Sequence, residues 1–303
     1  MFSIRGVRRA TTVVAAATLM LGLSGSSAWA QAAAEPADPN PGALTITGNI
    51  DFLNQYMFRG IAQNSTGMAI WPAFDLGIAA YSGEGGLKSV GINIGTWNSL
   101  HTGDTGLDTD ETLLGCACGK LWYESDFYAT LGLGFGGGVA LGTTYTSYTS
   151  PSNGFSTVKE IMFKLGVDDS AKLGKAALKP YVIFAFEFGT EEGTGQADGG
   201  LEAGKYLEFG VSPGYAGSKA ALAIPIKVGL SAGDYYELAG EDEKFGYVSI
   251  AGIVTVPLGG TTKAGSWNIH FGGEYQKLGE MPKALNGGES NQFIGSVGFG
   301  FSY

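Results

Sequence analysis

The two histidines of the chain are the side chains best suited to proton transfer near neutral pH. His101 precedes a run of acids that starts at Asp104, and His270 follows Asn268 by two residues. Ser249 lies on the alternating segment before that of His270, so the two side chains could be neighbours on adjacent strands. A serine beside a histidine is the arrangement of nucleophilic hydrolysis. A histidine that is only hydrogen-bonded within an interior is the favoured interpretation.

A second group of candidate residues is charged and recurs on neighbouring alternating segments. Glu160, Glu187 and Glu208 each stand two or three residues from the same end of three consecutive segments, so we expect them at similar height. Carboxylates that line a lumen concentrate cations and repel anions. The residues predicted to line the interior are Glu160, Lys164, Glu187, Glu208, Lys227, His270 and Glu274. Alternatively, Glu160 and Lys164 belong to a salt-bridge network that fills this interior.

Cys116 and Cys118 stand two residues apart, which places their Cα atoms about 6.6 Å apart in an extended strand. That separation is near the upper limit for a disulfide. A redox or metal pair is one interpretation, and two small residues on a tight face is the favoured one. With only two Cys and two His in the chain, no metal site and no cofactor are predicted.

The composition excludes several classes of protein. Among 303 residues there are 51 glycines, and charged residues make up only 15%, whereas soluble domains have roughly 25%. The net charge of −10 argues against a nucleic-acid partner, which requires a basic face. The hydrophobic fraction of 44% argues against disorder.

The N-terminal residues predict export from a Gram-negative cell. Arg5, Arg8 and Arg9 precede an apolar stretch over 11–23, and Ala28-Trp29-Ala30 forms a small-x-small cleavage pattern. We therefore predict a signal peptide over residues 1–30. Residues 31–43 contain three prolines and are predicted to form a loose periplasmic leader.

From residue 44 to residue 303, apolar and polar residues alternate with a period of two. In the last segment Phe293, Val297 and Phe301 share one face, and Ser296 and Gly300 share the other. Twelve segments are predicted: 44–58, 68–81, 88–99, 110–123, 127–145, 158–168, 181–189, 205–215, 220–235, 244–258, 267–278 and 291–303. Their even number and their lengths predict an all-β fold, a transmembrane antiparallel up-and-down β-barrel.

The predicted connections alternate in length, as they do in barrels of the bacterial outer membrane. The long ones are 59–67, 100–109, 146–157, 190–204, 236–243 and 279–290, and the short ones are 82–87, 124–126, 216–219 and 259–266. The exception, 169–180, fits either a short amphipathic helix or a long turn. Acids gather in the long loops, where they could hold divalent cations that bridge to lipopolysaccharide or could simply be solvated.

Outward aromatic residues are predicted at two heights, where amphipathic rings favour the boundary between lipid and water. Those expected at the periplasmic boundary are Phe127, Tyr215, Trp267, Phe301 and Tyr303. Those expected at the outer boundary are Tyr56, Phe58, Phe188, Tyr275 and Phe293.

The segment Asp51-Phe52-Leu53-Asn54-Gln55-Tyr56-Met57-Phe58-Arg59-Gly60-Ile61-Ala62-Gln63-Asn64 resembles the opening DYVFRGISQ of the TorF-like putative porins of proteobacteria. Residues 72–76 and 90–99 are similar to that family's second and third strands. Gln55 stands where the family has Asp, and Met57 stands where it has Val. The resemblance covers residues 44–99 and implies an outer-membrane barrel with a channel function.

These observations together predict an outer-membrane channel for small solutes or ions, without enzymatic activity and with a preference for cations. The expected partners are outer-membrane lipids, lipopolysaccharide, the diffusing solutes and the barrel assembly machinery. Two alternatives stay open: a barrel hydrolase of the lipid A deacylase or phospholipase type, and a non-conducting structural or adhesive barrel.

The predicted topology can be checked with an epitope tag inserted at Gly195, in the long loop 190–204. We expect antibodies to bind this tag on intact cells. A tag that is reached only after the outer membrane has been permeabilised would contradict the strand order.

Overall fold

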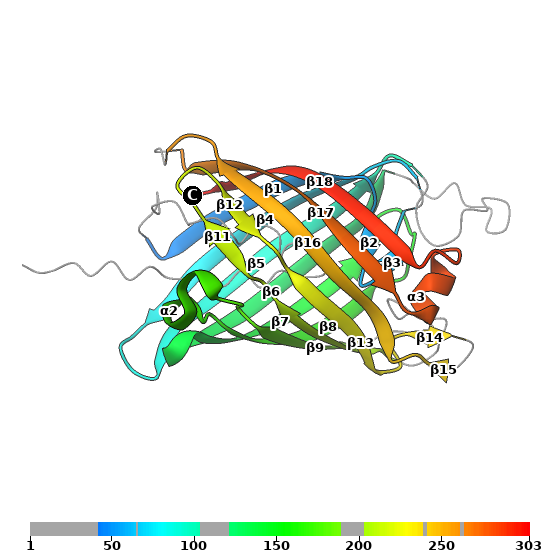
Figure 1. Cartoon of the computed structure of the whole chain (residues 1–303), viewed down its shortest axis with the longest axis horizontal. Helices are drawn as coiled ribbons and strands as arrows, with labels where there is room; N and C mark the ends of the chain where they lie inside the picture. The colour runs from blue at the N-terminus through cyan, green and yellow to red at the C-terminus, as the bar shows by residue number, and fades with distance from the viewer. Residues whose placement is uncertain (1–41, 65, 104–120, 189–202, 239–240, 261–263) are drawn as a thin grey trace, which may run out of the picture.

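The computed structural model describes residues 42–64, 66–103, 121–188, 203–238, 241–260 and 264–303. Over these residues the chain forms an antiparallel sheet that closes on itself as a barrel (Figure 1). The predicted signal peptide, residues 31–41, both cysteines and the tag position Gly195 lie outside the described residues. No helix within the described ranges is long and apolar enough to cross a membrane.

Twelve strands form the wall of the barrel; each is called a stave below, because two of them are interrupted and carry two strand labels. They are β1 (Leu44–Leu53), β4 (Ala69–Ser82), β5 (Leu87–His101), β6 (Trp122–Phe135), β7 (Val139–Thr149), β8 (Val158–Val167), β9 (Tyr181–Phe188), β10 with β11 (Lys205–Val211, Gly214–Ala216), β12 with β13 (Ala221–Ala223, Ile226–Gly233), β16 (Phe245–Pro257), β17 (Ser266–Leu278) and β18 (Asn291–Ser302). Strand β1 pairs with both β4 and β18, which closes the ring. The predicted fold class and the count of twelve are confirmed.

Two neighbouring staves are interrupted where a proline removes a backbone donor from the ladder. Pro213 separates β10 from β11, and Pro225 separates β12 from β13. Their carbonyl groups still take part in pairing, since Pro213 accepts from the N–H of Ile224 and Pro225 accepts from the N–H of Ala251. The barrel wall is therefore continuous through both interruptions.

The predicted strands 110–123 and 127–145 are wrong in their boundaries. The structure has β6 and β7 in their place, joined by the tight turn η2 (Gly136–Gly138), so the predicted turn at 124–126 is also wrong. Gly138 has φ 79°, and a Cβ there would lie 2.1 Å from the carbonyl oxygen of Asp168. Only glycine fits such a position. The apolar alternation continues on both sides of the glycines, so the period alone could not reveal the turn.

Long connections lie at one end of the barrel and most short ones at the other, as predicted (Figure 1). The long-loop end carries the small elements β2 (Met57–Phe58), β3 (Ile61–Ala62), β14 (Glu237–Leu238), β15 (Glu241–Asp242) and α3 (Glu280–Leu285). At the short-turn end, the exceptional connection between β8 and β9 contains α2 (Ser170–Leu173) and η3 (Gly174–Ala176). Of the two interpretations left open for this connection, the short helix is the correct one.

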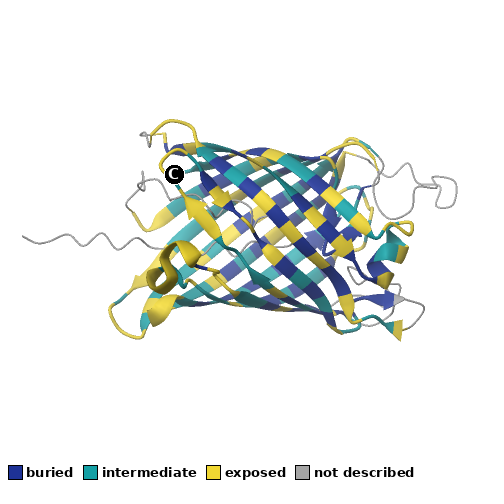
Figure 2. Ribbon diagram, viewed as in Figure 1, coloured by how far each residue is buried: buried dark blue, intermediate teal, exposed yellow. Residues whose placement is uncertain are grey.

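Buried and exposed residues alternate along each stave and produce a chequered wall (Figure 2). The exposed positions are largely apolar: Phe271 is 46% exposed and Phe299 is 44% exposed, near the middle of adjacent strands. The inward positions include buried Thr, Ser, Glu and Lys side chains. Polarity is thus inverted relative to a soluble sandwich, whose apolar side chains face a core.

Deleting Phe301 to Tyr303 should impair assembly of the barrel. Tyr303 exchanges two backbone hydrogen bonds with Ile46, and Phe301 pairs with Gly48, so these residues complete the seam between β18 and β1. Loss of the seam exposes unpaired strand edges. We expect less folded protein on unboiled gels and a lower level in the membrane fraction. The control Tyr303→Phe keeps the backbone and should assemble normally; normal levels of the truncated chain would contradict the argument.

Candidate functional site

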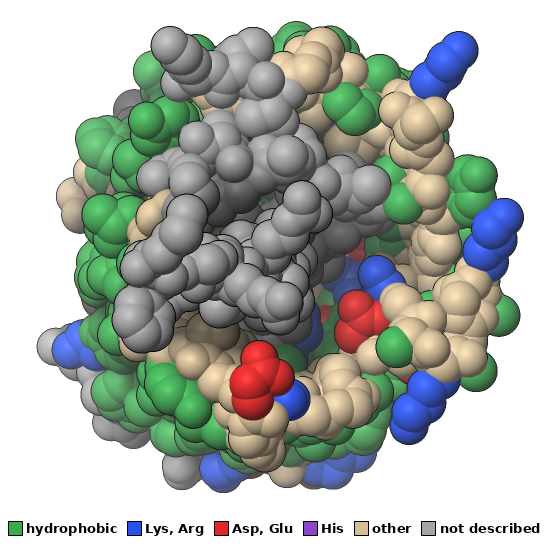
Figure 3. All heavy atoms as spheres, turned by 90° about the vertical axis from the view of Figure 1, so that its left-hand side faces the viewer, with side chains coloured by type: hydrophobic (Ala, Val, Ile, Leu, Met, Phe, Trp, Pro, Cys, Tyr) green, Lys and Arg blue, Asp and Glu red, His purple; other side chains and the backbone are tan. Residues whose placement is uncertain are grey.

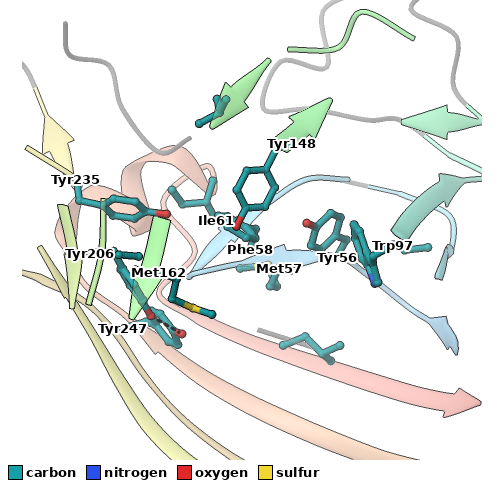
Figure 4. Close-up of a cluster of buried hydrophobic side chains, with 14 of the residues drawn as sticks. Tyr56, Met57, Phe58, Ile61, Trp97, Tyr148, Met162, Tyr206, Tyr235 and Tyr247 are labelled. Carbon is teal, nitrogen blue, oxygen red and sulfur yellow. Dashed lines mark hydrogen bonds between the residues drawn. The ribbon is translucent and has the colours of Figure 1, made fainter. Parts of the chain in front are cut away.

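A short hairpin folds into the barrel at the long-loop end. Strands β2 and β3 are joined by Arg59 and Gly60, whose φ values are 47° and 88°. Two central residues with positive φ are the signature of a tight hairpin turn whose twist suits the flanking strands. Met57, Phe58 and Ile61 are 6%, 5% and 1% exposed. The hairpin therefore occupies the interior, where its side chains pack against those of the wall (Figure 4).

This placement corrects two expectations from the sequence. Residues 44–58 are not one strand, since β1 ends at Leu53 and the chain then turns inward. Tyr56 and Phe58 are 2% and 5% exposed, so they do not belong to an outward aromatic belt.

A further correction concerns Phe127, on the wall. Phe127 is outward but lies on β6 opposite Ser147, which is close to the long-loop end of β7, and so is not at the predicted periplasmic boundary.

Arg59, at the tip of the hairpin, is held by a carboxylate and by aromatic rings. Its Nη1 and Nη2 donate to the Oε2 and Oε1 atoms of Glu160 at 2.6 and 2.9 Å. Nη1 also donates to the Tyr235 hydroxyl at 3.0 Å. The guanidinium carbon lies 4.1 Å from the centre of the Tyr206 ring, close enough for a cation–π contact. We call Glu160, Tyr206, Tyr235 and Phe58 the guanidinium cage, because the Phe58 ring lies 5.0 Å from the same carbon.

The cage is almost fully shielded from solvent: the Arg59 and Glu160 side chains are 3% and 1% exposed. Burial opposes the charge on Arg59, but the Glu160 carboxylate and the hydroxyls of Tyr235 and Tyr148 together outweigh burial and hold the pKa of the guanidinium above its usual range. Burial raises the pKa of the Tyr235 hydroxyl, which therefore stays protonated. The cage thus presents one negative charge and several neutral rings to one cation.

Three further contacts fix the hairpin backbone. The Tyr236 hydroxyl donates to the carbonyl of Arg59 at 2.8 Å. Asn286, next to α3, donates to the carbonyl of Gly60 at 2.8 Å and accepts from the N–H of Ala62 at 2.9 Å. Two residues from the C-terminal part of the chain therefore hold the polar groups of this N-terminal hairpin, as buried backbone requires.

A second polar cluster lies deeper in the barrel, around Glu208. Its carboxylate accepts from the hydroxyls of Tyr181, Tyr206 and Tyr247 at 2.8, 2.6 and 3.0 Å. Because the Tyr206 ring also contacts Arg59, this residue connects the cluster with the cage. Lys227 forms an ion pair with Glu274 at 3.7 Å. The Lys164 ammonium lies 4.7 Å from the centre of the Tyr181 ring.

The strand register corrects the predicted arrangement of the three glutamates. Glu160 pairs with Glu187, whereas Glu208 pairs with Ile183, four residues nearer the short-turn end of β9. The three carboxylates therefore do not meet at one height. The ionic partner of Glu160 is Arg59, and not Lys164 as the alternative prediction of a salt-bridge network had it.

The two histidines occupy separate positions. His270 bonds with Asp51 and, at 3.0 Å, with Asn268. Its strand neighbours are Thr255 and Gly298, while Ser249 pairs with Gln276, so the predicted proximity of Ser249 and His270 is wrong.

His101 ends β5 rather than lying in a loop. Its Nε2 lies 2.8 Å from the Ser99 hydroxyl, which also accepts from the Trp71 indole N–H at 2.9 Å. Ser99 and His101 are 0% and 1% exposed, so this pair faces the interior and not lipid. The sequence signal of this pair is a serine and a histidine two residues apart on one strand face.

The short-turn end of the barrel is hollow, and charged side chains of both signs are visible inside the opening (Figure 3). On β1, the inward Asp51 side chain keeps 18% exposure. Carboxylates predominate among the described charged residues on inward positions. The acids are Asp51, Asp75, Glu124, Asp126, Glu160, Glu187, Glu208 and Glu274, and the bases are Arg59, Lys164 and Lys227. Within the described residues, no group of three or more His, Cys, Asp or Glu side chains could hold a metal ion.

Comparison with known proteins finds similarities to solved structures only. No protein-family model and no curated protein matches it. Among solved structures it is similar to the NanC porin, with TM-score 0.41 and 13% identity over 86% of this chain and 99% of that chain. It is also similar to the Salmonella typhi outer membrane phospholipase OMPLA, with TM-score 0.43 and 12% identity over 88% and 91% of the two chains. The translocator domain of the autotransporter NalP from Neisseria meningitidis gives TM-score 0.38 and 15% identity over 86% and 89%.

These proteins differ in function, and similarities of this degree transfer none of it. The barrel architecture of the chain is established by its own strand pairing and not by these similarities. The resemblance of residues 44–99 to the TorF-like porins stays a prediction from those residues.

Replacing Arg59 by Met should destabilise the barrel by roughly 3–5 kcal/mol, because Glu160 would be left as a buried, uncompensated charge. The double variant R59M/E160Q should recover most of this loss. Urea unfolding in detergent micelles, followed by tryptophan fluorescence, measures both effects.

The matched control is Lys283→Met, which breaks the exposed ion pair between Lys283 and Glu280 on α3. Such a pair contributes no more than about 1 kcal/mol. A loss in R59M that is no larger than the loss in K283M would contradict a structural role for the buried pair.

Proposed function

We propose that the chain is a channel of the bacterial outer membrane, through which small cationic solutes or ions diffuse. The observation that carries this proposal is the inverted polarity of the closed wall, apolar outside and rich in carboxylates inside. An apolar outer band suits a barrel that is surrounded by lipid, and the polar interior suits an aqueous passage. The expected partners are outer-membrane lipids, lipopolysaccharide, the barrel assembly machinery and the solutes themselves.

The inserted hairpin is the proposed constriction of this channel. It fills the long-loop half, where Tyr148, Tyr206 and Tyr247 are 1%, 1% and 0% exposed around it (Figure 4). At the short-turn end the barrel has an opening with charged side chains inside it (Figure 3). A solute would therefore enter through this opening at one end and meet the hairpin near the other. Twelve strands suit such a passage, since barrels of eight strands are filled by side chains and barrels of sixteen enclose an open lumen.

We propose no enzymatic role. The Ser99–His101 pair is the arrangement closest to a hydrolytic site among the described residues, but both side chains are buried inside the barrel. A lipid hydrolase would need its nucleophile on the face that contacts lipid.

The selectivity of the channel is measurable as a reversal potential in a salt gradient across a planar bilayer. We expect small conductance and a preference for cations. Asp51→Asn with Asp75→Asn should move the reversal potential toward zero, because both carboxylates lie on inward positions outside the guanidinium cage. Glu280→Gln, on the exposed surface of α3, is the control that should leave it unchanged. A preference of the wild type for anions would refute the proposal.

The constriction has its own test. Replacing residues 57–62 by a flexible glycine-serine segment of equal length should increase the single-channel conductance severalfold, since the passage widens where the hairpin lay. The control replaces residues 151–154 in the same way, a turn at the same end of the barrel that stays mostly exposed. Equal conductance of the wild type and the hairpin variant would exclude the hairpin as the constriction.

A further inference from the structure

The guanidinium cage has the features of a ligand-binding site whose ligand is part of the chain. A bidentate carboxylate, a hydroxyl and the face of a phenol ring converge on one planar cation, with distances of 2.6, 2.9, 3.0 and 4.1 Å. These are the groups that recognise a guanidinium in a binding pocket: paired oxygens match its fork of N–H donors, and a ring face attracts its charge.

The cage and the Arg59 that it holds come from three parts of the chain: the wall, the inserted hairpin and a loop. Glu160 and Tyr206 lie on the wall strands β8 and β10, whereas Arg59 and Phe58 come from the inserted hairpin. Tyr235 comes from the loop that follows β13. If the hairpin moves away, the wall keeps the carboxylate and a ring but loses its cation. A buried carboxylate without a counter-charge is costly, so the vacated site would attract a cation of the same shape.

We propose that Glu160, Tyr206 and Tyr235 form a binding site for guanidinium-bearing solutes, which Arg59 occupies as an internal substitute until a solute displaces it. The site lies in the constriction of the proposed channel, so such solutes would be bound on their way through. The inference rests on the proposed function for the passage of the solute, but binding at the site does not require conduction.

Charge and shape both favour a guanidinium over other cations at this position. An ammonium group has one nitrogen and so makes a linear hydrogen bond with only one carboxylate oxygen at a time. In the structure, both Oε atoms of Glu160 accept hydrogen bonds from separate nitrogens of Arg59. Tyr148 also donates to Oε1 of Glu160, at 3.2 Å, and so fixes the plane of the carboxylate. A neutral isostere of guanidinium would leave the charge of Glu160 uncompensated.

The test uses Arg59→Ala, which removes the atoms of one ethylguanidine molecule beyond Cβ. Purified R59A protein in detergent micelles is titrated with ethylguanidine, and thermal unfolding is followed on the folded band of unboiled gels and by fluorescence. We expect a saturable rise of the unfolding midpoint, since a ligand that binds only the folded state stabilises it. The wild type should respond far more weakly, because its own Arg59 competes for the cage.

Three controls make the result specific. Ethylurea has nearly the same shape without charge and should not stabilise R59A, and ethylammonium has the charge without the fork and should bind at least about tenfold more weakly. The variant R59A/E160Q should respond to none of the three compounds. Equal responses to ethylguanidine and ethylurea, or an unchanged response in R59A/E160Q, would overturn the proposal.

If R59A fails to fold on its own, refolding from urea in the presence of each compound replaces the titration. Recovery of folded protein with ethylguanidine and not with ethylurea supports the site, and recovery with neither refutes it. In wild-type bilayers, ethylguanidinium should be more permeant than ethylammonium. Absence of any current there would count against the channel and leave the binding result intact, so the two failures are distinguishable.

Discussion

Closure of the sheet between β1 and β18 is the constraint on which the rest of the structure depends. A sheet with an apolar outer face cannot leave strand edges unpaired where water is absent, because each unpaired backbone group costs several kcal/mol. The register from Thr47–Ser302 to Leu53–Ser296 satisfies these groups and fixes which residues point inward on both strands. The register of each neighbouring strand then determines which of its side chains point into the barrel.

Closure also decides where large rings can lie. The barrel interior accommodates tyrosines because inward glycines on neighbouring strands leave room for them. A Cβ on Gly229 would lie 2.4 Å from the Tyr247 ring, and one on Gly210 would lie 2.4 Å from the Tyr181 ring. These glycines are the register partners of the tyrosines that cover them. Such pairs account for part of the unusual glycine content and place the hydroxyls around Glu208.

The inserted hairpin makes the two ends of the barrel interior different: its side chains are buried at the long-loop end, whereas the short-turn end has an opening (Figure 3). Several buried charges of the interior have partners suited to them: Arg59 has Glu160, Lys227 has Glu274, and Glu208 has three hydroxyls. Asp51 and His270 bond to each other across Gly298, which pairs with both of them in the sheet. The asymmetry between the two ends is the feature on which the proposed constriction depends.

The sequence by itself determined the barrel class, the number of strands, the alternation of long and short connections and the inward direction of residues such as Glu208 and His270. These follow from local alternation, which each strand carries independently of the others. Only the tertiary structure decided that residues 57–62 turn inward, that the glycines at 136–138 form a turn, and that Arg59 meets Glu160, 101 residues away. A hairpin in a barrel interior has the same alternation as a strand in the wall. The interior hairpin and the wall strand differ in the residues that they contact, and those residues come from distant parts of the chain.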